Sequence, residues 1–140
     1  MSPRTNSWLT DRLRALYAQS FADVPVTNTV LVKFGKKSRG RLGSIVLKPK
    51  KGYDQKVSVI SLNRILKDDC VPEYVIDAVL AHEFVHYVHG FNSPLPQLYR
   101  YPHQAGIVDR ELKKRGLAAL LDKEKLWTKQ NFAKLWKTVI

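Results

Sequence analysis

The chain has 140 residues, a hydrophobic share of 44% and a formal net charge of +12 at pH 7. This length fits one domain, because two halves would each bury only a thin core. The hydrophobic share is ordinary for a globular protein and excludes a disordered chain. No apolar run has the length of a signal peptide or of a membrane span. We therefore expect a cytoplasmic monomer, with a nucleoid or other DNA-associated location left open.

Positive charge is concentrated in residues 33–56, where Asp54 is the one acid. The basic residues of this stretch are Lys33, Lys36, Lys37, Arg39, Arg41, Lys48, Lys50, Lys51 and Lys56. Such a surface favours a polyanionic partner, with nucleic acid ahead of an anionic membrane. It is equally typical of a solvated, solubilising face.

The first half of the chain predicts one helix followed by a small sheet. Leucines at helical spacing predict a helix over residues 7–20, with Ser7 as its N-cap. Three short runs rich in β-branched residues, 29–34, 42–48 and 56–62, predict strands. The links between these strands are short and contain glycine or proline, so we expect antiparallel hairpins.

The second half is predicted to be helical, which makes the whole an α+β fold. Apolar periodicity predicts a helix over residues 73–89, ended by Gly90. Residues 91–101 read as a loop, and a third helix is expected over 102–115. Residues 117–140 are helical in propensity. The aromatics and lysines of this last segment suit either base stacking or burial on the domain, and their spacing favours burial.

The residues with clear chemistry are His82, Glu83 and His86, which lie within one predicted helix. Residues four apart on a helix point the same way, so both imidazoles can bind one zinc ion. Glu83 is turned about 100° from His82 and is better placed beside the metal than on it. There it can act as general base for a water that attacks a carbonyl. The single cysteine, Cys70, excludes a four-cysteine zinc site.

A catalytic zinc normally has three protein ligands and one open position, so a third ligand must come from elsewhere. His103, at the start of the predicted third helix, is favoured because it can approach from a different direction. Glu111 and Asp109, about two turns further along that helix, are the carboxylate alternatives. His89 is disfavoured because it lies two turns from His82 on the same helix, about 10 Å along the axis.

These motifs resemble the SprT-like (Spartan-type) zinc metalloprotease domain, a relative of the minigluzincins. The resemblance rests on residues 79–86 (VLAHEFVH), on 103–107 (HQAGI), and on the upstream order of a helix and three strands, with 41–43 (RLG) and 57–66 (VSVISLNRIL). It covers residues 7–116 and implies one SprT-like metallopeptidase domain over 1–140, with a basic helical segment at 117–140.

The resemblance implies that His82, His86 and His103 bind Zn²⁺ and that Glu83 is the general base. Eukaryotic members of the family degrade proteins crosslinked to DNA, which would suit the basic surface. The sequence departs from the family at Gln104, where glycine is common, and at Ile107, where an aromatic is common. It also lacks the Cys-rich zinc ribbon of many members, so DNA contact would rely on the 33–56 region and the C-terminal helix.

Two further features bear on substrate binding. Tyr99 and Tyr101 lie just before His103 and could stabilise a developing oxyanion, although ordinary loop packing is the simpler interpretation. The predicted strand 56–62 could offer a free edge to an extended peptide, provided that it is not paired on both sides.

The leading hypothesis is a zinc-dependent endopeptidase that acts on a protein or peptide, with DNA-associated proteins as one substrate class. A nucleic-acid-binding module with a structural zinc is the alternative from a different class. A regulatory protease specific for one protein partner is a further alternative, and a form inhibited by its own terminal segment is left open.

Overall fold

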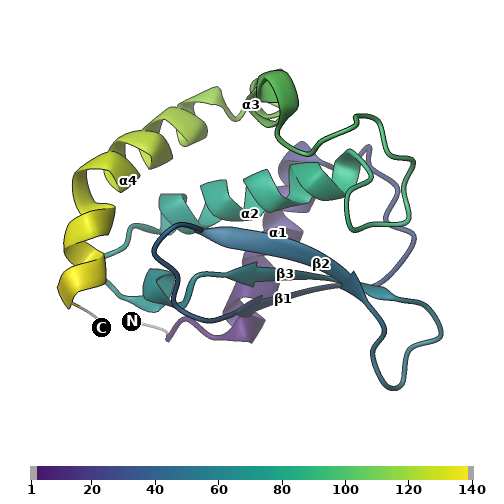
Figure 1. Ribbon diagram of the computed structural model, residues 1–140, viewed down its shortest axis with the longest axis horizontal. Helices are drawn as coiled ribbons and strands as arrows, with labels where there is room; N and C mark the ends of the chain where they lie inside the picture. The colour runs from purple at the N-terminus through teal and green to yellow at the C-terminus, as the bar shows by residue number, and fades with distance from the viewer. Residues whose placement is uncertain (1–2, 139–140) are drawn as a thin grey trace.

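The structure is a computed structural model, and it describes residues 3–138. Its elements in chain order are α1 (Asn6–Ser20), β1 (Val30–Phe34), β2 (Gly43–Lys48), β3 (Val57–Leu62), the 3-10 turn η1 (Arg64–Lys67), α2 (Glu73–Val88), the 3-10 turn η2 (Gln104–Gly106), α3 (Ile107–Lys114) and α4 (Ala118–Thr138). The predicted α+β class is confirmed. Figure 1 shows α2 running between the sheet and α4, and α2 contacts β2, β3, α1, α3 and α4.

The three strands form one sheet in the order β1-β3-β2. β2 pairs with β3 antiparallel, as a hairpin should. β1 pairs with β3 in parallel, and β1 and β2 are not neighbours. The expectation of hairpin pairing is therefore right for the second connection and wrong for the first. Half of the pairing in the sheet is parallel rather than antiparallel.

The connection from β1 to β2 is not a hairpin because it crosses the carboxyl end of β3. Gly35 N donates to Leu62 O over 2.8 Å, and Asn63 N donates to Leu42 O over 2.8 Å. The buried Asn63 side chain then holds the connection from inside. Its amide donates to Ser38 O over 2.6 Å and to Arg41 O over 2.9 Å. These bonds satisfy two carbonyls of the connection, which lie outside the strands and have no sheet partner there.

β3 is the central strand, and its residues are nearly all buried. This explains its continuous apolar sequence, which is typical of strands covered on both faces. Because β3 is paired on both sides, the hypothesis that it offers a free edge to a substrate is wrong. The strand with an unpaired edge next to α2 is β2.

α2 is buried around most of its circumference. Val75, Leu80 and Val85 are each 0% exposed, although their side chains leave the helix in three different directions. A helix that is apolar all round belongs in the interior. The helix starts after Pro72 and ends at Val88, one residue earlier than expected, with His89 as its C-cap.

The helices α1 and α4 agree with the sequence except in detail. α1 begins one residue before the predicted start, and its N-cap is Thr5, whose Oγ1 accepts a hydrogen bond from Trp8 N, rather than Ser7. In α4 the aromatic residues Trp127, Phe132 and Trp136 pack partly buried against the core, which confirms the favoured burial. In residues 3–138, no helix has both the length and the apolar character needed to cross a membrane.

The end of α2 provides a test of the fold. Gly90 has a φ of +81°, and a Cβ added there would lie 2.2 Å from the carbonyl oxygen of Pro96. Gly116 has a φ of +80°, but an added Cβ would meet nothing within 4 Å. We predict that Gly116→Ala lowers the free energy of unfolding by about 1 kcal/mol, from backbone strain alone. Gly90→Ala should lower it by at least about 3 kcal/mol, because the loop must also move.

Urea unfolding followed by circular dichroism measures both losses. Equal losses in the two variants would contradict the close contact between Gly90 and the loop.

Candidate metal site

His82 and His86 lie one turn apart on α2 and line the same cleft. Their ring centroids are 5.0 Å apart. His86 is 4% exposed, and His82 is partly exposed toward the cleft. The helical spacing thus places both imidazoles on one side, as the sequence predicts.

The loop after α2 brings His103 to the same point. Its ring centroid is 4.6 Å from that of His86 and 5.5 Å from that of His82. The Nε2 atoms of His82 and His103 are 3.4 Å apart. One potential ligand atom from each of the three histidines lies within 4.8 Å of the others. The three side chains therefore form a group that could hold a metal ion.

His103 does not begin the third helix, and that expectation is wrong. The helix α3 starts at Ile107, after the 3-10 turn η2. The break occurs because Ala105 has a φ of +50° and Gly106 a φ of +67°, both outside helical geometry. His103 is thus held by a loop and a tight turn.

The two histidines on α2 are neutral at pH 7. Burial first, and the neighbouring imidazoles second, lower the pKa of His82 to about 4 and that of His86 to about 3. A neutral imidazole presents the lone pair that a metal ion needs. In residues 3–138 the buried Nδ1 of His86 has no hydrogen-bond partner. Three neighbouring imidazoles with little hydrogen bonding to the protein fit the donor set of a catalytic zinc.

Glu83 lies beside the histidines and is 5% exposed. Burial raises the pKa of its carboxyl from 4.5 to about 7, and the positive charge of Arg41 opposes that rise. A carboxyl group with a pKa near neutral pH can both accept and return a proton under physiological conditions. A group that exchanges a proton near neutral pH therefore lies next to the three histidines.

The approach of α2 to β2 is close at Gly43. A Cβ added to Gly43 would lie 2.9 Å from Cγ1 of Val79 and 3.1 Å from Cγ of Glu83. A larger residue would push the helix from the strand. Gly43 therefore lets Glu83 lie directly beside the unpaired edge of the sheet.

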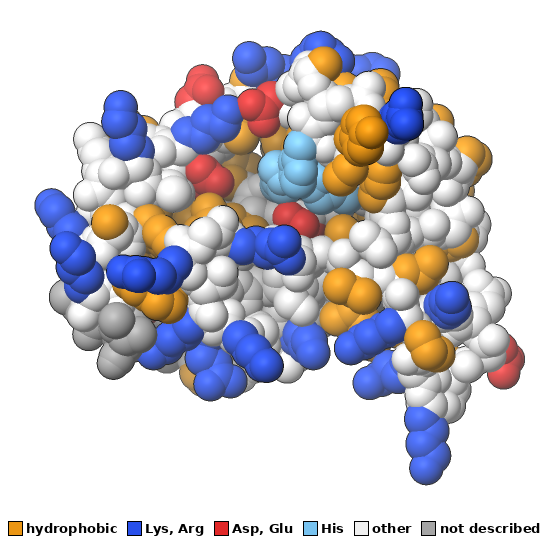
Figure 2. Space-filling model, viewed as in Figure 1, with side chains coloured by type: hydrophobic (Ala, Val, Ile, Leu, Met, Phe, Trp, Pro, Cys, Tyr) orange, Lys and Arg blue, Asp and Glu red, His pale blue; other side chains and the backbone are white. Residues whose placement is uncertain are grey.

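The cleft around these groups is lined from the sheet side, from α2, from the loop after α2 and from α4. Residues 40–45 form the wall on the sheet side. Phe91, Asn92 and Pro102 come from the loop after α2, and Glu124 comes from α4. Figure 2 shows the histidine side chains in a hollow on this face, with acidic side chains close to them and lysines and arginines around the rim. The cleft is therefore built from four parts of the chain that are far apart in sequence: residues 40–45, α2, the loop after α2, and α4.

The other predicted ligands do not join the histidine group. Asp109 accepts a bond from Lys125 Nζ over 2.6 Å. His89 is 1% exposed, and its Nε2 lies 3.2 Å from Glu111 Oε1. Each of these groups is therefore engaged by a protein partner.

Tyr99 and Tyr101 do not line the cleft. Tyr99 packs its ring 5.0 Å from that of His89, and Tyr101 is 58% exposed beneath the guanidinium of Arg100. This placement agrees with loop packing and does not support a role in oxyanion stabilisation for either residue.

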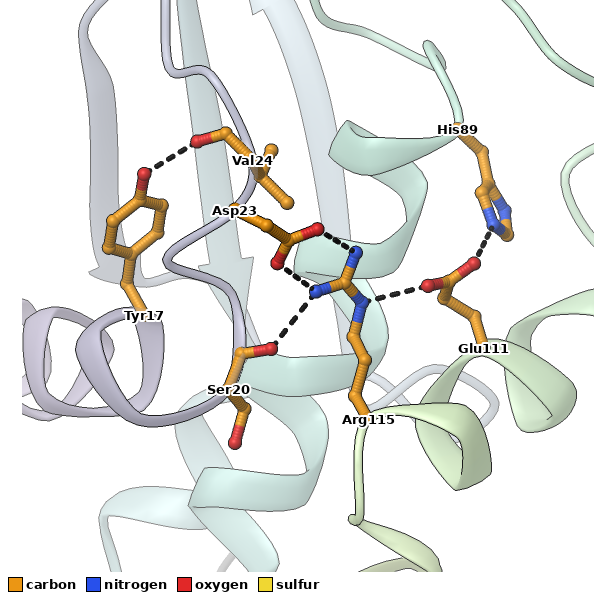
Figure 3. A network of polar contacts seen from close by, with 7 residues as sticks. All are labelled: Tyr17, Ser20, Asp23, Val24, His89, Glu111 and Arg115. Atoms are coloured by element: carbon orange, nitrogen blue, oxygen red, sulfur yellow. Dashed lines mark hydrogen bonds and ion pairs between the residues drawn. The ribbon is translucent and has the colours of Figure 1, made fainter.

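His89 and Glu111 belong to a polar network that joins three helices (Figure 3). Arg115 Nε donates to Glu111 Oε2 over 2.8 Å, and Arg115 also pairs with Asp23 over 2.7 Å. The network ties the end of α2 to α3 and to the segment after α1. Because Leu98 N donates to His89 O over 3.0 Å, it also anchors the loop that leads to His103.

The sequence did not single out Arg41 or Glu124 as cleft residues. From the sequence, Arg41 is identified only as a basic residue of 33–56 and as the first residue of the 41–43 element of the resemblance. Glu124 carries no local signal, because its position in the cleft depends on how α4 packs over α2. Only the tertiary arrangement reveals either residue.

No family model matches the chain, and no curated protein does. Among solved structures, its fold is similar to the crystal structure of the metallopeptidase zymogen of Methanocaldococcus jannaschii jannalysin. The TM-score is 0.51 at 14% sequence identity, over 89% of this chain and 96% of that chain. The likeness covers nearly the whole of both chains and shows that this chain has a metallopeptidase-like fold.

Proposed function

We propose that this chain is a zinc-dependent endopeptidase in which His82, His86 and His103 bind the metal ion and Glu83 is the general base. The observation that carries the proposal is the group of three imidazoles beside a buried carboxyl group in an open cleft. In residues 3–138, no fourth His, Cys, Asp or Glu joins the three histidines. Three ligands suit a catalytic zinc, whereas a structural zinc would take four.

Zinc bound here would acidify a water molecule and polarise the carbonyl of the scissile bond. Glu83 would accept the proton of the attacking water on a carboxylate oxygen and pass it to the leaving nitrogen. Its burial supports this cycle, because a carboxyl group with a pKa of about 7 readily takes up and returns the proton. The positive charge of Arg41, on the sheet wall, favours the ionised form of Glu83.

The free edge of β2 would hold the substrate. Residues 43–45 of β2 line the cleft, and within residues 3–138 the one strand that pairs with β2 is β3. An extended peptide can add to such an edge through backbone hydrogen bonds. The peptide bond would then pass over the three histidines and Glu83.

We further propose a relationship to the SprT-like proteases. It is supported by the order of a helix, three strands and the 79–86 motif, together with the position of His103 after a loop. The metallopeptidase-like fold is compatible with this relationship.

The catalytic roles predict separate effects on metal binding and on cleavage. Glu83→Gln should keep about one zinc per chain and lose at least about a thousandfold in kcat/KM on a casein substrate. His103→Ala should lose both the metal and the activity, since two ligands hold zinc weakly. Asp109→Asn is the control and should keep both. Metal analysis beside the cleavage assay would disprove the assignment if Glu83→Gln stayed active or His103→Ala kept its zinc.

Removing the metal ion should make stability depend on pH through Glu83. Its folded-state pKa of about 7 lies above the ordinary 4.5, so the stabilisation is present below pH 4.5 and lost as the pH rises through 7. Glu83→Gln cannot ionise. As the pH rises from 4.5 to 7, the metal-free wild type should therefore lose about 3 kcal/mol of unfolding free energy relative to metal-free Glu83→Gln.

Both proteins carry the same histidines, so the opposite pH effect of His82 and His86 cancels in this comparison. Chemical unfolding in the presence of a chelator at several pH values gives the difference. A constant difference across this range would rule out the raised pKa.

For the substrate class we propose proteins associated with DNA. The support is the basic connection from β1 to β2, which lies against the cleft. Lys36, Lys37 and Arg41 line a shallow hollow together with Ser38 and Ser61, and Arg41 also lines the cleft. A strand of DNA bound along this connection would bring its attached proteins near the histidine group.

DNA binding is tested with single-stranded oligonucleotide and the Glu83→Gln protein. Affinity should fall steeply with salt. Lys36→Glu, in the hollow, should weaken binding about tenfold and reduce the salt slope by about one. Lys113→Glu makes the same charge change at an exposed position of α3, away from the hollow, and should have a smaller effect. Equal effects of the two substitutions would indicate a general field rather than a site at residues 35–42.

A further inference from the structure

Glu124 is a charged residue of the cleft to which the proposed reaction assigns no role. It lies on α4, on the wall opposite the sheet, and lines the same cleft as His82 and Glu83. It is partly buried. Glu83 and Glu124 are the carboxyl groups among the residues that line the cleft. Since Glu83 is needed for proton transfer, Glu124 is available to contact a substrate.

The Glu124 carboxylate has little compensation from the protein. Its hydrogen bond comes from Thr128 Oγ1 over 3.4 Å, which is long for a hydroxyl donor. In the part of the chain that the structure describes, no lysine or arginine forms an ion pair with it. The adjacent Lys125 instead pairs with Asp109 of α3 over 2.6 Å. Burial raises the pKa of Glu124, the direction expected of a carboxyl group with too few partners.

A partly buried carboxylate that faces a cleft is best satisfied by a cation from the ligand, because charge-assisted hydrogen bonds are the strongest available to it. The cleft also offers apolar surface from Phe91 and Pro102. Lysine and arginine combine an apolar stem with a charged end, so they match both features.

We propose that Glu124 is a specificity-determining residue that binds a lysine or arginine side chain of the peptide substrate. This inference rests on the proposed peptidase function and names a preference of the same cleft. The overall charge cannot produce such a preference, because a chain with a net charge of +12 repels basic peptides. A preference for lysine must therefore come from a local acidic group.

The test measures peptide binding separately from cleavage. The Glu83→Gln protein with zinc is titrated into fluorescein-labelled peptides, in which one lysine is moved along an otherwise uncharged sequence. Norleucine, which has nearly the same stem without the charge, replaces lysine in the matched peptides. At one position, lysine should bind about tenfold more tightly than norleucine.

Adding Glu124→Gln should abolish this preference, and adding Glu124→Lys should replace it with a preference for glutamate at the same position. Asp122→Asn is the matched control. Asp122 is an exposed acid on the same helix that does not line the cleft, so this change should leave the preference intact. Lysine and norleucine peptides that bind equally or not at all, or a preference that survives Glu124→Gln, would overturn the proposal.

Cleavage of the same peptides by the wild-type protein distinguishes a failure of the peptidase function from a failure of the role of Glu124. Binding that prefers lysine without any cleavage would refute the peptidase function and leave the role of Glu124 in place. Cleavage with no preference would refute only the role of Glu124. An increase in the cleavage of every peptide after Glu124→Gln would also overturn the proposal, since it would mean that Glu124 blocks the cleft.

Discussion

The packing of α2 between the sheet and the outer helices is the constraint on which the site depends. It buries Glu83 and His86 beside apolar residues such as Val79 and Phe84. The loss of water raises the pKa of the Glu83 carboxyl group to near neutral pH and lowers that of the His86 imidazole, which is therefore uncharged at pH 7. These are the protonation properties that the proposed metal-assisted hydrolysis needs. The same packing brings the helix within contact distance of the backbone at Gly43. One packing arrangement thus sets both the chemistry of these groups and their place beside a free strand edge.

The third histidine depends on a different set of contacts. His103 is exposed and lies on a loop, so its position is only as fixed as the loop itself. The loop is held where it leaves α2, by the contact of Gly90 with Pro96 and by the bond from Leu98 N to His89 O. His89 is in turn fixed by Glu111 and Arg115. A histidine next to the site thus supports its geometry without joining the three-histidine group.

Local patterns were sufficient for part of this structure. The spacing of His82 and His86 placed both rings on one side of a helix, because helical periodicity depends on near neighbours alone. The boundaries of the strands were also close to those predicted. The order of the strands was not predictable, because it depends on Asn63 holding the first connection across the end of β3. The start of α3 was missed because the positive φ of Ala105 has no sequence signal, alanine being a good helix former.

The two walls of the cleft differ in what they can recognise. The edge of β2 offers backbone groups, which bind any extended peptide with little regard to its side chains. Selectivity must then come from side chains that face the peptide from elsewhere. Arg41 lies at the sheet wall close enough to Glu83 to lower its pKa, so the charge of Arg41 already acts on the proposed general base. Glu124, on α4, is free of that task, and so the helix wall is where the choice among substrates would be made.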